Sequence, residues 1–121
     1  MRKVICAAIR KEGKILLVKK KETWILPGGK PKRKEPDKQC LIREFSEELP
    51  LTKLKNIKFY RTVKGQTPHR KDMIESKVYF ADLTGETYPY AEIKAAVWTK
   101  NPEKFNLSEI TRKIIEDLLS E

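Results

Sequence analysis

The sequence predicts an α+β protein in which a mixed β-sheet is packed between helices, as an α/β/α sandwich. Short apolar runs typical of strands precede, separate and follow one central segment of helical periodicity, and a second helical pattern ends the chain. The length of 121 residues suits one compact domain and is too short for two ordinary ones. We therefore expect a single domain over residues 1–121.

Three short strands are predicted before residue 30. The apolar run 4–9 is typical of a buried strand, and a Glu-Gly turn at residues 12–13 leads into an apolar partner at 15–18. A third apolar segment, 24–26, ends at a Pro-Gly-Gly sequence that favours a turn. The first two strands are expected to pair as a hairpin.

A basic loop over residues 30–34 leads into the central helix. Pro36 suits the first turn of a helix, where its missing N–H costs nothing. Asp37 suits the same positively polarised end. The helix is expected to run to about Leu49, because Pro50 forces the residue before it out of helical geometry.

The second half of the chain continues with strands and closes with a helix. Residues 57–63 are typical of a strand, residues 65–72 form a polar loop, and residues 73–83 are typical of a second long strand. Residues 95–98 form a last short strand. The final helix has one apolar face, marked by Ile110, Ile114 and Leu118.

The charge balance favours an anionic partner. Lysine and arginine number 27 against 17 acidic residues, a net charge of +10. Such an excess attracts nucleotides, nucleic acids, phosphoinositides or anionic membranes, and solubility alone is an equal explanation. No apolar run approaches the roughly 20 residues of a membrane span, so no membrane partner is expected.

The cysteines and the N-terminus indicate a reducing compartment. Cys6 and Cys40 lie in apolar segments without a CxxC or Cys/His cluster, which argues against zinc. Buried packing as free thiols is the expected role. The chain starts directly in a strand pattern with no signal-peptide core. We therefore expect a cytoplasmic protein.

The central helix carries an acidic stripe. At 100° per residue, Glu44, Glu47 and Glu48 fall within an arc of about 100°. Like charges at these spacings repel by a few tenths of a kcal/mol per pair. A divalent cation such as Mg²⁺ or Mn²⁺ removes that conflict, because both prefer carboxylate oxygens. The alternative is a solvated acidic face. Apolar residues on the other side are expected to face the core: Leu41, Ile42, Phe45 and Leu49.

The residues around this stripe closely resemble the Nudix box. Gly29 is followed after five residues by Glu35, and after seven more by Arg-Glu-Phe-Ser-Glu-Glu-Leu-Pro-Leu at 43–51. Every fixed position of the family pattern matches except its last glycine, which is Pro50 here. The lead-in at 24–28 is also similar to that of the family. The resemblance is therefore to Nudix hydrolases, MutT-like members in particular, with the motif at 29–51.

The resemblance implies roles for the motif residues. A bound Mg²⁺, with Mn²⁺ as the alternative, would use as ligands Gly29 through its carbonyl, Glu44, Glu47 and Glu48. Arg43 would hold the glutamates in place through ion pairs, and Glu35 would support the site. A carboxylate close to the metal, Glu44 or Glu47 in the box, could take the proton of the attacking water.

A further acid is expected from outside the box. Glu92 lies six residues before Trp98. In the family, a similar acid before a tryptophan-ended strand joins the metals or acts as general base, which makes Glu92 a candidate catalytic residue. Glu75 is the fallback, and a solvated loop carboxylate is the structural alternative.

Substrate-binding candidates lie beside the motif and before the last helix. Lys30, in the basic loop, could hold polyphosphate, and Trp24 could stack on a base or simply pack in the core. Asn106 resembles the base-reading asparagine of MutT-like members. It also fits a helix N-cap box with Glu109 reaching back.

Three weaker signals complete the set. Lys19, Lys20 and Lys21 read as an exposed hairpin end, with phosphate binding as the less favoured alternative. His69 lies in a polar loop and is not expected to be catalytic. Pro68 stands at a distance from the box that is similar to the ADP-ribose-cleaving branch.

The resemblance implies hydrolysis of a nucleoside diphosphate linked to another group. We expect a MutT-like nucleoside triphosphate pyrophosphohydrolase that releases a nucleoside monophosphate and pyrophosphate. Dinucleoside polyphosphates and RNA 5′ ends are alternative substrates within the same chemistry, and a diphosphate-containing small molecule is the common requirement. A Nudix-fold module that binds nucleic acid without cleaving it is the alternative from another class.

Overall fold

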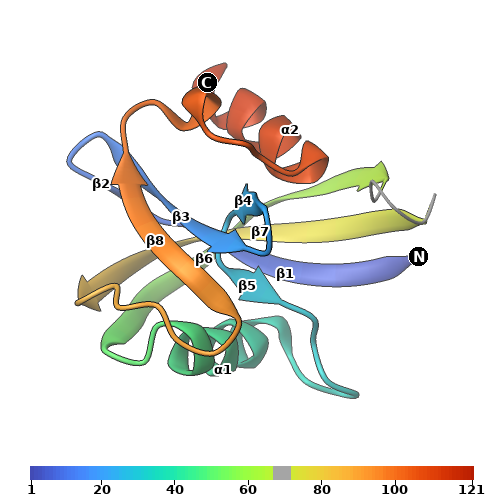
Figure 1. Ribbon diagram of the computed structural model, residues 1–121. Coiled ribbons are helices and arrows are strands. Elements are labelled where there is room, and N and C mark those ends of the chain that lie inside the picture. The colour runs from blue at the N-terminus through green and yellow to red at the C-terminus, as the bar shows by residue number, and fades with distance from the viewer. Residues whose placement is uncertain (67–71) are drawn as a thin grey trace.

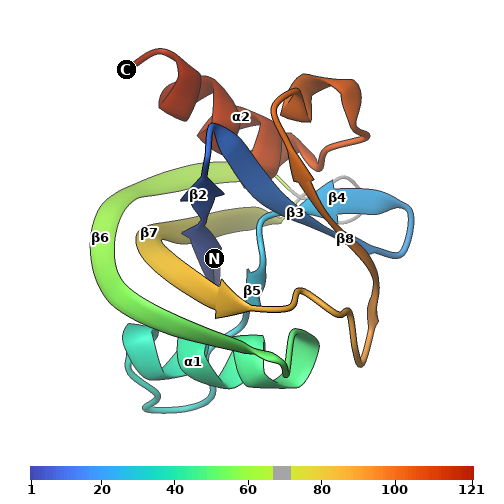
Figure 2. The ribbon, with the colours of Figure 1, turned by 90° about the vertical axis from the view of Figure 1, so that its left-hand side faces the viewer.

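The computed structural model describes residues 1–66 and 72–121, and it shows an α+β fold with helices on both sides of β-sheets. Helix α1 (Asp37–Glu48) covers one side and helix α2 (Glu109–Leu119) the other (Figures 1 and 2). This confirms the predicted fold class. The expectations for Pro68 and His69 lie outside the described residues.

The first sheet is mixed and has the strand order β5-β1-β7-β6. Its members are β1 (Arg2–Ala8), β5 (Gly28–Gly29), β6 (Thr52–Gln66) and β7 (Met73–Gly85). β1 and β7 run parallel, with Val4 opposite Ser76, whereas β5 and β6 pair antiparallel with their neighbours. The parallel pairing brings residues about 70 positions apart into contact at the centre of the molecule.

The second sheet is antiparallel and is organised around β3 (Lys14–Lys20). Its other strands are β2 (Arg10–Lys11), β4 (Thr23–Ile25) and β8 (Ile93–Thr99). The pairing of β3 with β8 is regular from Ile15 to Lys19 and then shifts, so that Lys20 lies opposite Ile93. The shift changes which residues meet at this end of β3.

The core consists of two apolar clusters, one on each side of the sheets. Leu41 and Phe45 of α1 belong to the first cluster, together with alternate residues of β1 and β3. Ile114 and Leu118 of α2 belong to the second. Burial of these two helix faces against the sheets provides the main apolar driving force for the fold. Both cysteines are buried free thiols, as expected.

The edge strand β6 is longer than the sequence predicted. The expected strand began at residue 57, but pairing with β7 begins at Thr52. Two irregularities, between Lys55 and Lys58 and between Phe59 and Arg61, interrupt the pairing, and Asn56 has a φ of 55°. A bulge shifts the alternation of facing residues, so a period-2 pattern is not visible across it. The first half of β6 was missed for this reason.

Three unpredicted elements and two wrong expectations also distinguish the structure from the sequence analysis. The short strands β2 and β5 and the 3-10 helix η1 (Pro102–Lys104) were not predicted. Ile42 was expected to face the core but is 53% exposed, because the buried face of α1 follows Leu41, Phe45 and Glu48. The N-cap of α2 is Ser108, whose side chain accepts from the Thr111 N–H, so Asn106 is not the cap.

No helix in the described ranges is long and apolar enough to cross a membrane.

Candidate active site

The site begins where β5 runs close to α1. Gly29 pairs with Ile5, and a side chain at position 29 would collide with all three carboxyl atoms of Glu44. At Gly28 the φ of 150° and the closeness of the Ile5 carbonyl exclude any Cβ. The two glycines therefore allow the Glu44 carboxylate to lie directly against the backbone of β5.

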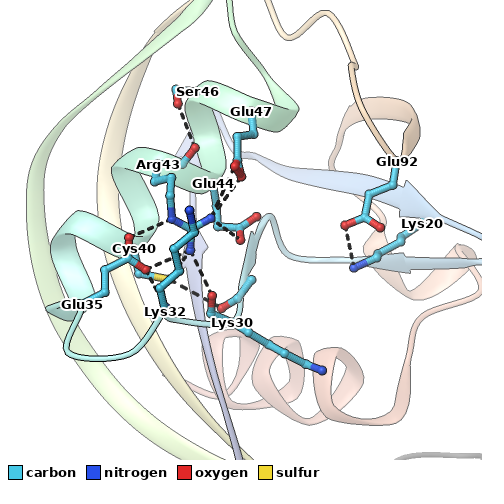
Figure 3. A network of polar contacts seen from close by, with 11 residues as sticks. Lys20, Lys30, Lys32, Glu35, Cys40, Arg43, Glu44, Ser46, Glu47 and Glu92 are labelled. Atoms are coloured by element: carbon cyan, nitrogen blue, oxygen red, sulfur yellow. Dashed lines mark hydrogen bonds and ion pairs between the residues drawn. The ribbon is translucent and has the colours of Figure 1, made fainter.

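Arg43 connects most of the acidic residues of the motif (Figure 3). Its Nε and one terminal nitrogen donate to both oxygens of Glu35, at 2.8 and 2.9 Å. The other terminal nitrogen donates to Glu44 and Glu47, each at 3.0 Å. A further bond of 3.0 Å reaches the carbonyl of Lys30. The planar fork of arginine suits this arrangement, since it presents several donors in fixed directions.

The ion pair with Arg43 keeps Glu35 charged. Hydrogen bonds from Arg43 and from the Lys32 backbone N–H lower the pKa of Glu35 to about 2. In turn, Glu35 and Glu44 raise the pKa of the Arg43 guanidinium above its ordinary value. Glu35 therefore ties the loop before α1 to the helix itself.

Glu48 is the most unusual residue of the motif. Its residue surface is only 3% exposed, and one carboxyl oxygen is buried without any hydrogen-bond partner. Burial, followed by the charge of Glu44, raises the pKa of Glu48 to about 8. A buried carboxylate oxygen without a donor is costly. The position is therefore one where a bound cation would relieve an existing strain.

The residues present fit a divalent cation. Glu44, Glu48 and the glycine-rich β5 supply hard oxygen atoms next to one another, and burial raises the pKa of Glu44 as well. Among the described residues, no three acidic, cysteine or histidine side chains already surround a common point. The reason is that Glu44 and Glu47 both turn toward Arg43. A cation would have to draw them away from that ion pair.

A cavity of about 420 Å³ opens beside these carboxylates and extends under the start of α2. The exposed surface of its walls is mostly apolar, with polar and charged side chains distributed among the aliphatic ones. The charged residues that line it include Glu44, Lys20, Lys30 and Glu92. Lys20 and Glu92 form an ion pair of 3.1 Å (Figure 3). Two of the residues predicted from the sequence, Lys30 and Glu92, thus share one cavity with a motif glutamate.

Three other sequence candidates lie elsewhere. Trp24 packs edge-on against Phe105, with ring centroids 5.1 Å apart, and it is not among the cavity residues. Asn106 donates its side-chain amide to the Glu22 carbonyl at 2.9 Å and is also outside the cavity lining. Glu75, the fallback acid, lies on β7 and does not line the cavity either.

Several cavity residues were missed from the sequence, and for Lys20 phosphate binding was only the less favoured alternative. Cys6 and Ser76 are buried side by side in the cavity wall, with Sγ and Oγ 3.4 Å apart. Lys20 was grouped with its two neighbours as a hairpin end. No local pattern distinguishes these residues, because their proximity depends on which strands pair and in which register.

The model of the NUDIX domain family matches residues 1–118. The chain belongs to the Nudix family. This match covers nearly the whole sequence and includes every motif residue described above. It confirms the resemblance inferred from the box at 29–51, although Pro50 replaces the last glycine of that box. No curated protein sequence matches the chain.

Solved structures of Nudix proteins are closely similar. The MutT Nudix hydrolase from Burkholderia pseudomallei is 28% identical, with a TM-score of 0.79 and 95% of each chain covered. The MutT protein from Methanosarcina mazei Go1 is 22% identical, with a TM-score of 0.79, over 96% of this chain and 91% of the other. An ADP-ribose pyrophosphatase from Streptococcus suis is 24% identical, with a TM-score of 0.68, over 98% and 87%.

The family match and the neighbour at 28% identity confirm that the chain is a MutT-like Nudix hydrolase. Members of the Nudix family generally depend on a divalent metal. The named activities of the neighbours concern nucleotide-derived compounds, as in the ADP-ribose pyrophosphatase. At 22–24% identity the last two neighbours indicate only the fold, so the reaction of this Nudix protein has to be argued from its own site.

Proposed function

We propose that this Nudix protein is a magnesium-dependent nucleoside triphosphate pyrophosphohydrolase that yields a nucleoside monophosphate and pyrophosphate. The observation that carries the proposal is Glu48, a buried carboxyl with an unpartnered oxygen, on the same helix as Glu44, which lines the cavity of about 420 Å³. A binding module would gain nothing from retaining an uncompensated buried acid, since removal of the acid would stabilise it.

We assign the metal site to Glu44, Glu47, Glu48 and the Gly29 carbonyl, with Mn²⁺ as a substitute for Mg²⁺. When bound, the cation supplies charge neutralisation for the phosphates and lowers the pKa of a coordinated water. Arg43 holds and neutralises Glu44 and Glu47 in the metal-free state, because it contacts both at 3.0 Å, and the cation would replace it as their partner. Glu35 fixes the arginine in turn.

Glu92 is the proposed acceptor of the proton from the attacking water. It enters the site from the loop before β8, opposite α1, and it lines the same cavity as Glu44. Arg43 does not contact it, and among the described residues its ion-pair partner is Lys20. A carboxylate held by one lysine can leave that ion pair and accept a proton more easily than one fixed by several hydrogen bonds.

The cavity supports a nucleoside as the group bound beside the phosphates. A volume of about 420 Å³ lies in the range of small-molecule sites, and mostly apolar walls suit a flat base. The most similar structure described above is itself named a MutT hydrolase. Ser76 and Cys6 are the polar groups that we expect to contact the base, in place of Trp24 and Asn106.

A screen of diphosphate compounds tests the proposal. Nucleoside triphosphates, ADP-ribose, dinucleoside polyphosphates and triphosphorylated RNA are each incubated with Mg²⁺ or Mn²⁺, and the products are separated and identified. We expect the triphosphates to give monophosphate and pyrophosphate. Glu47→Gln and Glu48→Gln should each lower the rate at least about a hundredfold. A decrease of less than threefold in both variants would rule out the proposed metal site.

The same screen decides between the alternatives. A preference for dinucleoside polyphosphates or RNA 5′ ends keeps the metal site but changes the substrate, and the net charge of +10 agrees with either. A nucleic-acid-binding module would show no turnover on any compound and RNA affinity that survives Glu48→Gln. We also propose a cytoplasmic location, since both thiols are free and buried.

A further inference from the structure

The Lys20–Glu92 pair lies in the wall of the cavity that Glu44 also lines. A phosphate chain that reached Glu44 through this cavity would share it with both side chains. In water, such an exposed pair contributes little to stability, about 0–1 kcal/mol. A contribution to stability therefore does not explain why this ion pair lies in the cavity wall.

The strand pairing brings the two residues together through an irregularity. Up to Lys19, each residue of β3 faces one of β8 in regular register, which would place Lys20 opposite Lys94. The shift instead sets Lys20 opposite Ile93, next to Glu92. Irregularities of this kind often redirect a side chain near a functional site. Here the extra residue is Lys94 of β8, and the shift leaves Glu92 close enough to form its ion pair with Lys20.

The charge of Lys20 acts on the motif carboxylates as well. Burial raises the pKa of both Glu44 and Glu48, and the positive charge of Lys20 works against that rise in each case. The neighbouring lysines are placed differently. Lys21 is exposed in the turn after β3, with a φ of 56°, and neither Lys19 nor Lys21 lines the cavity.

We propose that Lys20 is a phosphate-binding residue of this enzyme, and that Glu92 is its partner only until substrate arrives. A polyphosphate chain carries several negative charges against the single charge of Glu92, and it takes over the ammonium group. Glu92 is then released beside the reacting phosphate. The exchange links substrate binding to the freeing of the carboxylate, which explains why the free enzyme keeps the two side chains paired at 3.1 Å. This inference deepens the proposed function and rests on it.

Binding of methylenediphosphonate tests the role of Lys20 without hydrolysis. This diphosphate mimic has a carbon bridge that water cannot cleave, and its affinity is measured by calorimetry at a Mg²⁺ concentration that saturates each variant. We expect Lys20→Met to weaken binding about tenfold, because a charge-assisted hydrogen bond is lost. Lys20→Arg should recover most of that affinity. The matched control, Lys21→Met, should stay within about twofold of wild type, because its charge is only weakly felt at the cavity.

Glu92→Gln should change the affinity for the mimic in the opposite direction. It removes the competitor for Lys20 and one negative charge near the phosphates, so the mimic should bind about threefold more tightly. In the Lys20→Met background the same substitution should have a smaller effect, since the two residues act on one ammonium group. A purely structural ion pair would not produce opposite changes in affinity.

The outcomes are separable from those of the proposed function. A loss at least fivefold larger for Lys20→Met than for Lys21→Met supports the inference, and any smaller difference overturns it. If the mimic binds as expected but no diphosphate compound is hydrolysed, the proposed function fails and the role of Lys20 stands. If hydrolysis depends on Glu48 but Lys20→Met binds the mimic as tightly as wild type, the proposed function stands and the role of Lys20 fails.

Discussion

Replacing Glu48 by glutamine should stabilise the metal-free protein while abolishing its activity. The carboxyl is buried with one oxygen unpartnered, and burial followed by the charge of Glu44 raises its pKa to about 8. A protein that folds around such a group must either keep it protonated or bear the cost of a buried charge. Glutamine has a similar shape and no charge, so it removes that cost.

The magnitude follows from the two pKa values. Below pH 4.5, the ordinary value, the carboxyl is protonated in both folded and unfolded states, and it contributes no pH-dependent penalty. Between 4.5 and about 8 only the unfolded state ionises, so wild-type stability falls by about 1.36 kcal/mol per pH unit relative to the variant. Above the folded value the difference is constant, at about 5 kcal/mol as an upper limit.

Urea unfolding in EDTA at pH 4.5, 6, 7 and 8.5 measures this difference. The free energy of unfolding of Glu48→Gln should exceed that of wild type increasingly with pH, and by more than about 2 kcal/mol at pH 8.5. Glu47→Gln is the matched control: its side chain is 48% exposed, so the variant should lose activity but change stability by less than about 1 kcal/mol. Equal stabilities of Glu48→Gln and wild type across the pH range would refute the reasoning.

Three other substitutions have expected outcomes. In Gly29→Ala the new methyl group displaces the flexible Glu44 carboxylate, so kcat should fall at least about tenfold, while the melting temperature changes little. Arg43→Lys cannot reach all its acceptors with one ammonium group, and steady-state kinetics should show a similar fall in kcat with a smaller change in KM. Asn106→Ala loses its bond to the Glu22 carbonyl, so chemical denaturation should show a loss of about 1 kcal/mol, with the ratio of kcat/KM between bases unchanged within about twofold.

The acidic cluster could be predicted from the sequence because its geometry is local. Glu44, Glu47 and Glu48 share one helix, and the helical period alone places them on adjoining faces. Their individual environments could not be predicted in the same way. Whether a helix position is buried depends on what packs against it, and here Glu48 turns inward with Leu41 while Ile42 faces solvent.

The cavity residues were harder to predict because they come from strands that pair at long range. Ser76 and Cys6 meet only because β1 and β7 run parallel in one register. Lys20 meets Glu92 only through the shift in the pairing of β3 with β8. A shift of one residue turns a side chain to the other face of a sheet, so no pattern within either strand specifies these neighbours.

The motif presents a conflict between stability and chemistry. Three carboxylates on one helix repel each other, and Arg43 neutralises the two that can reach it, Glu44 and Glu47, while Glu48 is left buried without a counter-charge. If the arginine alone had to make the helix stable, replacement of Glu48 by an apolar residue would be the simpler solution. Glu48 lies on the same helix as Glu44, which lines the cavity and for which Gly29 makes room, and the ion that we propose would compensate the one carboxylate that Arg43 does not reach.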